Sequence, residues 1–202
     1  MQFLRRLEAL GIPVTAAATV SAPVDPAAAF RRPICSPRPE DAAWVKGCIN
    51  NMLWSYEEYG RVPGFAAWAI RPEHVAASRR FYDGELGWSD FNAGLPATLP
   101  AMLRSEFVAS AASGEGRFWE TLDCVEAYRW KIRTPLRCYA GDSDEAIPAA
   151  VSRMVIDFHR LLGGTAVEFF SAGPRADHRG SFVQATLDVK PWFDGFTGPG
   201  VR

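Results

Sequence analysis

The residues with the clearest chemical potential are an aspartate and a histidine that each follow a predicted strand. Asp144 lies in the acidic stretch GDSDEAIP, at the end of the apolar run 135–141, and His178 comes shortly after the apolar run 166–170. A carboxylate bonded to one imidazole nitrogen fixes the tautomer of the ring, and the other nitrogen can then take a proton from a hydroxyl nucleophile. The pair therefore predicts two thirds of a catalytic triad.

A strand, a helix and a second strand are predicted to position these two side chains. Residues 135–141 and 166–170 are short and apolar, and residues 147–162 between them have the amphipathic spacing of a helix. A further helix is predicted over about 179–188. Strands connected in this order are parallel, and neighbouring strands are about 5 Å apart, so the loops that follow them can bring a carboxylate and an imidazole into contact.

The first part of the chain predicts a helix and one more strand. Residues 1–10 have helical spacing and end at Gly11, and residues 12–22 form a nearly continuous apolar run. Such a run is typical of a strand that is buried on both faces of a parallel sheet. Pro23 marks its end.

The residue pattern of 24–133 differs from that of the segments on either side and predicts a mainly helical insertion. Helices are expected over 40–60, over 72–82 and, as shorter pieces, near 97–112 and 117–129. The side chains expected on the inner face of the first of these helices are Trp44, Val45, Cys48, Met52 and Tyr56. The chain is thus predicted to be an α/β protein with a partial sheet core over 1–23 and 134–202 and a helical lid over 24–133.

Composition and cysteine spacing exclude several classes of function. Among 202 residues, 22 Lys and Arg face 23 Asp and Glu, so no charge excess favours a nucleic acid or an anionic membrane as partner. No uncharged run is long enough to span a bilayer. The four cysteines form no CxxC pair, which argues against a zinc site, and Cys35 and Cys48 are either bridged in a secreted protein or free thiols.

The end of the chain resembles α/β hydrolases of the esterase, lipase and peptidase type. The stretch TPLRCYAGDSDEAIP, followed after about thirty residues by ADHRGSF, carries the likeness. That family places its acid in a Gly-x-x-Asp-x-x-(Val/Ile)-Pro pattern, matched here by Gly141, Asp144, Ile147 and Pro148, and its histidine after the last strand, matched by His178. The resemblance implies Asp144 as the acid, with Asp142 as the alternative. Asp177 and Arg179 are expected to structure the histidine loop.

One element of the family is absent from the sequence. No Gly-x-Ser-x-Gly elbow occurs, and the resemblance places it several residues upstream of Met1, so that Met1 would be an internal methionine of a longer reading frame. The possible substitutes Ser21, Ser143, Ser181 and Cys138 all lie in unsuitable positions. Without an upstream neighbour, the strand over 12–20 would expose an apolar edge that favours self-association.

The resemblance implies hydrolysis of a small-molecule ester, in preference to an amide, without a metal or an organic cofactor. His178 would act as general base and then acid, with Asp144 orienting it, and this chain by itself would be inactive. A non-catalytic binding module on the same scaffold, or an acyltransferase, remains as an alternative. Five aromatic residues could line a substrate pocket or simply pack the lid: Trp54, Tyr56, Tyr59, Phe65 and Trp68.

Overall fold

The computed structural model describes residues 1–197, which divide into two compact units. One unit comprises Met1–Ala29 with Leu122–Arg202, and the other comprises Phe30–Thr121. We call the first the sheet unit and the second the helical unit.

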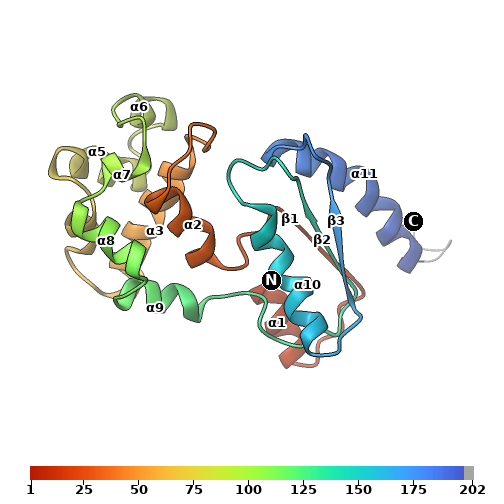
Figure 1. The fold of residues 1–202 in the computed structure, drawn as a ribbon. Helices are drawn as coiled ribbons and strands as arrows, with labels where there is room; N and C mark the ends of the chain where they lie inside the picture. The colour runs from red at the N-terminus through yellow and green to blue at the C-terminus, as the bar shows by residue number, and fades with distance from the viewer. Residues whose placement is uncertain (198–202) are drawn as a thin grey trace. The chain divides into compact units, whose positions relative to one another are not determined.

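The sheet unit is built on three parallel strands in the order β1-β2-β3 (Figure 1). The strands are β1 (Ala17–Val20), β2 (Leu136–Ala140) and β3 (Val167–Ser171). The register places Val20 beside Tyr139, and Tyr139 beside Phe170. The carboxyl ends of all three strands therefore meet at one edge, and the predicted parallel α/β arrangement is confirmed.

Helices cover both faces of this small sheet. The unit contains α1 (Gln2–Ala9), α10 (Ala149–Leu161) and α11 (His178–Thr197), and Figure 1 shows α10 and α11 on opposite sides of the strands. The central strand β2 is buried on both faces, and α10 packs Val151, Val155 and Ile156 into the core. The last helix is longer than predicted, and it begins at His178 itself.

The first strand differs from its prediction in length and burial. The expected strand covered the apolar run 12–22, whereas β1 is confined to Ala17–Val20, and all of its residues are only half-buried. Ile12 is exposed. The reason is its place at the edge of the sheet, because only β2 pairs with it among the described residues. An apolar run indicates a strand that is suited to burial, but the strand is buried only where other strands or helices cover it.

A buried carboxylate ties α1 to the chain that leads into β2. One oxygen of Glu8 accepts the backbone N–H groups of Arg133 and Thr134, at 2.9 and 2.8 Å. The same oxygen accepts the Thr134 hydroxyl at 2.8 Å, and the second oxygen accepts the indole N–H of Trp130 at 3.1 Å. Burial by itself would raise the pKa of Glu8, but the donors from Thr134, Arg133 and Trp130 outweigh it and hold the pKa below its usual value.

Gly141 marks the point where the loop after β2 meets the loop after β3. A Cβ atom at Gly141 would collide with the backbone carbonyl of Ala176 and with the hydroxyl of Ser181. Glycine is needed here for close approach of two backbone segments, since no other side chain leaves this space.

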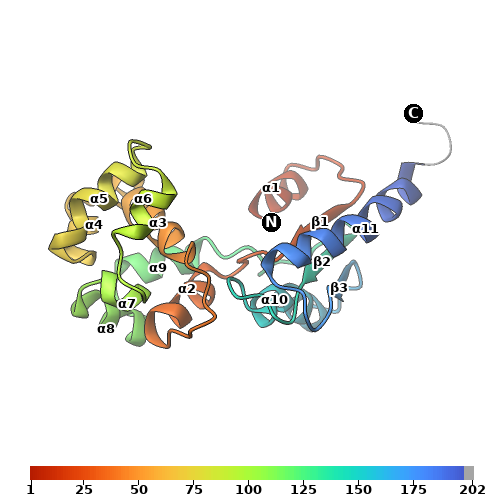
Figure 2. The same ribbon diagram turned by 90° about the horizontal axis from the view of Figure 1, so that it is seen from above.

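The helical unit consists of helices joined by loops, from the four residues of α7 to the 16 residues of α3 (Figure 2). Its helices are α3 (Val45–Gly60), α4 (Phe65–Ala69), α5 (Pro72–Tyr82), α6 (Trp88–Ala93), α7 (Leu99–Met102) and α8 (Ser105–Ser113). The chain passes between the two units within α2 (Pro26–Cys35) and α9 (Arg117–Cys124). The prediction of α5 was correct to the residue, whereas α2, α4 and α6 were not predicted.

The buried face of α3 corrects the predicted one. Val45 is buried as expected, but the residues that accompany it are Ile49, Leu53 and Trp54. The expected Trp44, Cys48, Met52 and Tyr56 are half-exposed. Both sets have the spacing of a helix face, so the sequence period alone does not distinguish which of them meets the neighbouring helices.

No helix within residues 1–197 is long and apolar enough to cross a membrane.

We expect Glu8→Gln to lower the free energy of unfolding by about 1–3 kcal/mol at neutral pH, because an amide NH₂ would face donors that now have an acceptor. The folded pKa of Glu8 lies below 4.5, so its contribution is present above that pH and is lost as the pH falls through the folded pKa. Urea unfolding of both proteins should therefore show a difference that narrows in acid. A difference that stays constant with pH would contradict this account.

We expect Gly141→Ala to destabilise the sheet unit by about 2 kcal/mol or more, because the added methyl has no room between the two loops. Gly195→Ala in α11 is the matched control, since a Cβ there meets no atom within 4 Å. Thermal unfolding followed by circular dichroism measures both. Equal stabilities of the two variants would show that the loops separate without cost.

Candidate functional site

Asp144 is held by the turn that joins β2 to α10. Its Oδ1 accepts the backbone N–H groups of Ala146 and Ile147, at 3.0 and 2.8 Å. An aspartate that binds its own following backbone in this way forms a tight turn. The carboxylate is fully shielded from solvent. Hydrogen bonds within the turn are therefore enough to orient this carboxylate.

His178 is held at the first position of α11. Asp177, the preceding residue, accepts the backbone N–H of Gly180 on its Oδ1 at 2.6 Å and so caps the helix. The backbone N–H of His178 donates to Oε2 of Glu145, at 3.0 Å. These two bonds hold the backbone at the start of α11 and so limit the positions that the imidazole can take.

The two side chains meet at the carboxyl edge of the sheet. Nδ1 of His178 lies 3.1 Å from Oδ2 and 3.2 Å from Oδ1 of Asp144. The imidazole is 20% exposed, and the ring of Phe182 packs edge-on against it at 5.4 Å. A carboxylate at Nδ1 favours the tautomer in which Nδ1 carries the proton and leaves Nε2 basic. The geometry can support general acid and base chemistry at Nε2.

Further hydrogen bonds connect the loop after β2, which contains Asp144, to the loop after β3, which leads to His178. The hydroxyl of Ser143 donates to the carbonyl of Pro174 at 2.7 Å, and its backbone N–H donates to Ala176 at 3.2 Å. Asp142, the alternative acid, accepts the hydroxyl of Ser171 on its Oδ2 at 3.0 Å. The structure thus brings Asp144, rather than Asp142, to the Nδ1 atom of His178.

The residues considered as substitute nucleophiles lie in different settings. The hydroxyl of Ser181 donates to the Asp177 carbonyl at 2.8 Å, and Ser143 belongs to the loop contacts just described. Ser21 follows β1 with a left-handed backbone, φ 45°, and its buried hydroxyl has no hydrogen-bond partner among the described residues. Burial raises the pKa of the Cys138 thiol to about 11, so this sulfur is protonated at neutral pH.

The other two histidines are placed apart from this pair. His159 is buried in α10, where its Nε2 accepts the backbone N–H of Ala166 at 3.0 Å, and burial lowers its pKa. His74 lies on α5 in the helical unit. Within residues 1–197, no group of three His, Cys, Asp or Glu side chains could hold a metal ion, and all four cysteines are free thiols.

The five aromatic residues predicted to line a substrate pocket all lie in the helical unit but are not all brought together. Tyr56, Phe65 and Trp68 belong to one cluster, in which Phe65 contacts Tyr56 at 4.7 Å and Trp68 at 5.4 Å. Trp54 is buried and donates its indole N–H to Ser78 at 2.7 Å. Tyr59 is 85% exposed. Their role in binding a substrate remains a prediction.

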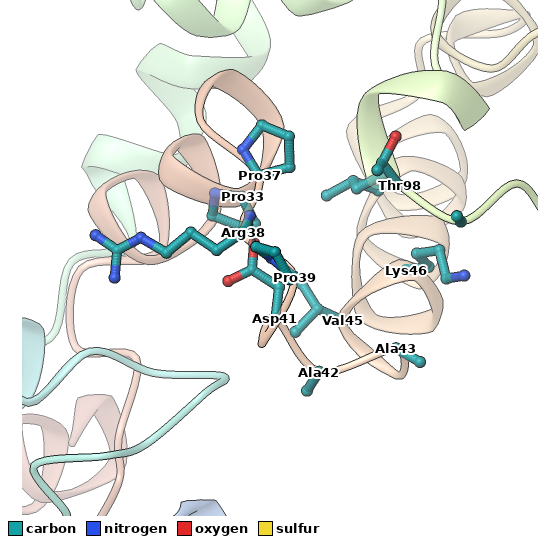
Figure 3. A pocket seen from close by; sticks show the side chains of 12 residues that line it. Pro33, Pro37, Arg38, Pro39, Asp41, Ala42, Ala43, Val45, Lys46 and Thr98 are labelled. Carbon is teal, nitrogen blue, oxygen red and sulfur yellow. Dashed lines mark hydrogen bonds between the residues drawn. The ribbon is translucent and has the colours of Figure 1, made fainter.

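The helical unit also contains a cavity of about 320 Å³ (Figure 3). Pro33, Pro37 and Pro39 lie on one wall, and Thr98 lies on the opposite one (Figure 3). Lys46 also contributes to the lining, and its ammonium group donates to the carbonyl of Pro96 at 3.0 Å. Burial lowers the pKa of this lysine. All residues that line the cavity come from the helical unit, whereas Asp144 and His178 belong to the sheet unit.

Glu145 is the residue at this site that the sequence did not single out. It stands directly after Asp144 in GDSDEAIP, where it reads as one more acidic residue of a turn. Only its bond to the backbone of His178 reveals a connection to the histidine.

Comparison with known proteins gives likenesses of structure alone. No protein-family model matches the chain, and no curated protein matches it. A Legionella pneumophila protein provisionally described as a hydrolase superposes with a TM-score of 0.81 at 17% identity, over 98% of this chain and 53% of that one. The rice cell wall degrading esterase LipA of Xanthomonas oryzae superposes with a TM-score of 0.71 at 17% identity, over 93% of this chain and 52% of LipA.

A variant of the same LipA gives a TM-score of 0.77 at 16% identity, over 95% of this chain and 54% of that one. The chain thus spans about half the length of each of these structures. At such identities the likeness establishes the fold. The chain has an α/β-hydrolase-like fold, which it shares with structures described as a hydrolase and an esterase.

Proposed function

We propose that this chain supplies the acid and the histidine of a serine hydrolase that acts on small-molecule esters. The observation that carries the proposal is the contact of 3.1 Å between Nδ1 of His178 and the buried carboxylate of Asp144 at the carboxyl edge of a parallel sheet. Sites in open parallel sheets form at this edge. The esterase named above shares the fold, which supports ester hydrolysis over other reactions of a triad.

In the proposed reaction, Nε2 of His178 takes the proton of a serine hydroxyl while that oxygen attacks the ester carbonyl. The proton then passes to the alkoxide that leaves, and an acyl-serine remains. Water then attacks the acyl-serine with the same histidine as base. The imidazolium returns this proton to the serine oxygen as the acyl C–O bond breaks, so the serine is regenerated and the carboxylic acid product leaves. Asp144 keeps the proton on Nδ1 and stabilises the imidazolium that forms in each half of the reaction.

The serine is proposed to come from a segment outside residues 1–202, because the sequence contains no Gly-x-Ser-x-Gly. Two surfaces of the sheet unit support this. The outer edge of β1 is unpaired among the described strands. Large apolar side chains are also exposed on α1, just after it and on α11, namely Phe3, Leu10, Phe182, Val183 and Leu187. A strand beside β1 that led into the serine turn would cover such surface.

The helical unit is proposed to act as a lid over the site, with some of its aromatic residues in contact with the substrate. Tyr56, Phe65 and Trp68 are the candidates that the structure groups together. Ordinary packing explains the buried Trp54 equally well.

A second candidate function is a non-catalytic binding module on the same scaffold. The cavity in the helical unit favours it, because residues of this chain line that cavity, whereas the proposed serine lies outside the chain. Ligand binding without hydrolysis, after the upstream segment has been restored, would support the module over the enzyme.

We expect this chain alone to remain unlabelled by a fluorophosphonate that carries a fluorophore, since it has no activated serine. The chain extended upstream through a Gly-x-Ser-x-Gly segment should be labelled on that serine and should hydrolyse p-nitrophenyl esters. Labelling of the 202-residue chain itself, or an upstream sequence with an in-frame stop and no such segment, would contradict the proposal.

In the extended chain, we expect Asp144→Asn to lower kcat by about 10⁴-fold, because the amide no longer holds the imidazole in the right tautomer. Asp157→Asn, on the exposed side of α10, is the matched control and should retain the full rate. Steady-state kinetics on one ester measure both variants. Full activity of Asp144→Asn would remove this residue from the mechanism.

A further inference from the structure

Two consecutive residues of the acid turn contact the same histidine. Asp144 contacts the ring of His178, and Glu145 accepts its backbone N–H at 3.0 Å. We propose that Glu145 is a positioning residue, which holds the start of α11 so that the imidazole meets Asp144. This inference rests on the proposed function, since it gives Glu145 a purpose in the proposed triad.

The first N–H groups of a helix have no acceptor within that helix. In α11, Asp177 satisfies the N–H of Gly180, and Glu145 satisfies the N–H of His178. A carboxylate is also favoured beside the positive end of a helix dipole, and its hydrogen bond to a backbone N–H is stronger than one between neutral groups. Glu145 therefore acts as a cap that is supplied by the neighbouring loop.

The place of this bond distinguishes it from the other contacts between the two loops. Ser143 binds Pro174 and Ala176, which precede the helix. Glu145 binds the backbone from which the imidazole projects. Ser143 thus holds the loop near the acid turn, whereas Glu145 fixes the Cα position of His178 relative to Asp144.

The chain direction makes this double contact possible. Asp144 turns its carboxylate back to the N–H groups of Ala146 and Ile147, and the next side chain points from the turn to the start of α11. Asp144 therefore contacts the ring of His178, and Glu145 contacts its backbone. If the backbone could shift, the ring would follow it, and the bond to Asp144 would open more often.

The test measures the proton on Nδ1 of His178 by NMR in the full chain, which contains only three histidines. We expect exchange of this proton with solvent to be about tenfold faster in Glu145→Ala, which corresponds to the loss of one hydrogen bond. Glu145→Gln keeps an acceptor oxygen at the same reach and should exchange close to the unmodified rate. Ser143→Ala is the matched control from the same turn and should also stay close to it.

Unchanged exchange in Glu145→Ala, or an equal acceleration in Ser143→Ala, would overturn the proposal, because Glu145 would then have no specific effect on the histidine. The ring signals of His159 should not move, since this histidine lies in α10. If Glu145→Ala does not fold, Glu145→Asp replaces it, because its shorter side chain loses the reach to the helix. Normal exchange in the aspartate variant would equally overturn the proposal.

The readout separates this inference from the proposed function, because the exchange experiment needs no serine and no turnover. In an active extended chain, Glu145→Ala should lower kcat by about tenfold and leave KM unchanged, and Glu145→Gln should recover most of the rate. An inactive extended chain with the expected exchange pattern would refute ester hydrolysis and retain the positioning role.

Discussion

The close approach of two loops at Gly141 is the constraint on which the candidate site depends. The carbonyl of Ala176 occupies the space that a side chain at Gly141 would need, so the loop after β3 can lie directly against the loop after β2. This contact brings the shielded carboxylate of Asp144 to the ring of His178. Polar contacts from Asp142, Ser143 and Glu145 also connect the two loops, and the small size of Gly141 permits the close approach in which they form.

The same arrangement explains how a small sheet can carry a defined site. All three strands end at the same edge, and local hydrogen bonds hold Asp144 after β2 and Asp177 after β3. At the opposite end of β2, Glu8 accepts the backbone N–H groups of Arg133 and Thr134 and so holds the segment that leads into the strand. Strand β1 has a neighbour on only one side within the described residues.

The division into a sheet unit and a helical unit fits the proposal of a partial hydrolase with a lid. The likeness to a hydrolase and to the esterase LipA extends over nearly all of this chain and about half of theirs. It establishes the fold, while the proposed chemistry rests on the contact between Asp144 and His178. The cavity among the prolines of the helical unit is a feature of its own and gives the binding alternative its basis.

The sequence by itself determined the strands β2 and β3, the helix between them, and the positions of Asp144 and His178 directly after these strands. These features depend on spacing within a few residues, as in the pattern from Gly141 to Pro148, and such local patterns restrict the backbone directly. Only the tertiary structure decided which face of α3 is buried, how exposed β1 is, where the five aromatic side chains lie, and that Glu145 reaches His178. Each of these features depends on which distant part of the chain packs against the residue. The spacing of residues along the sequence does not specify that packing partner.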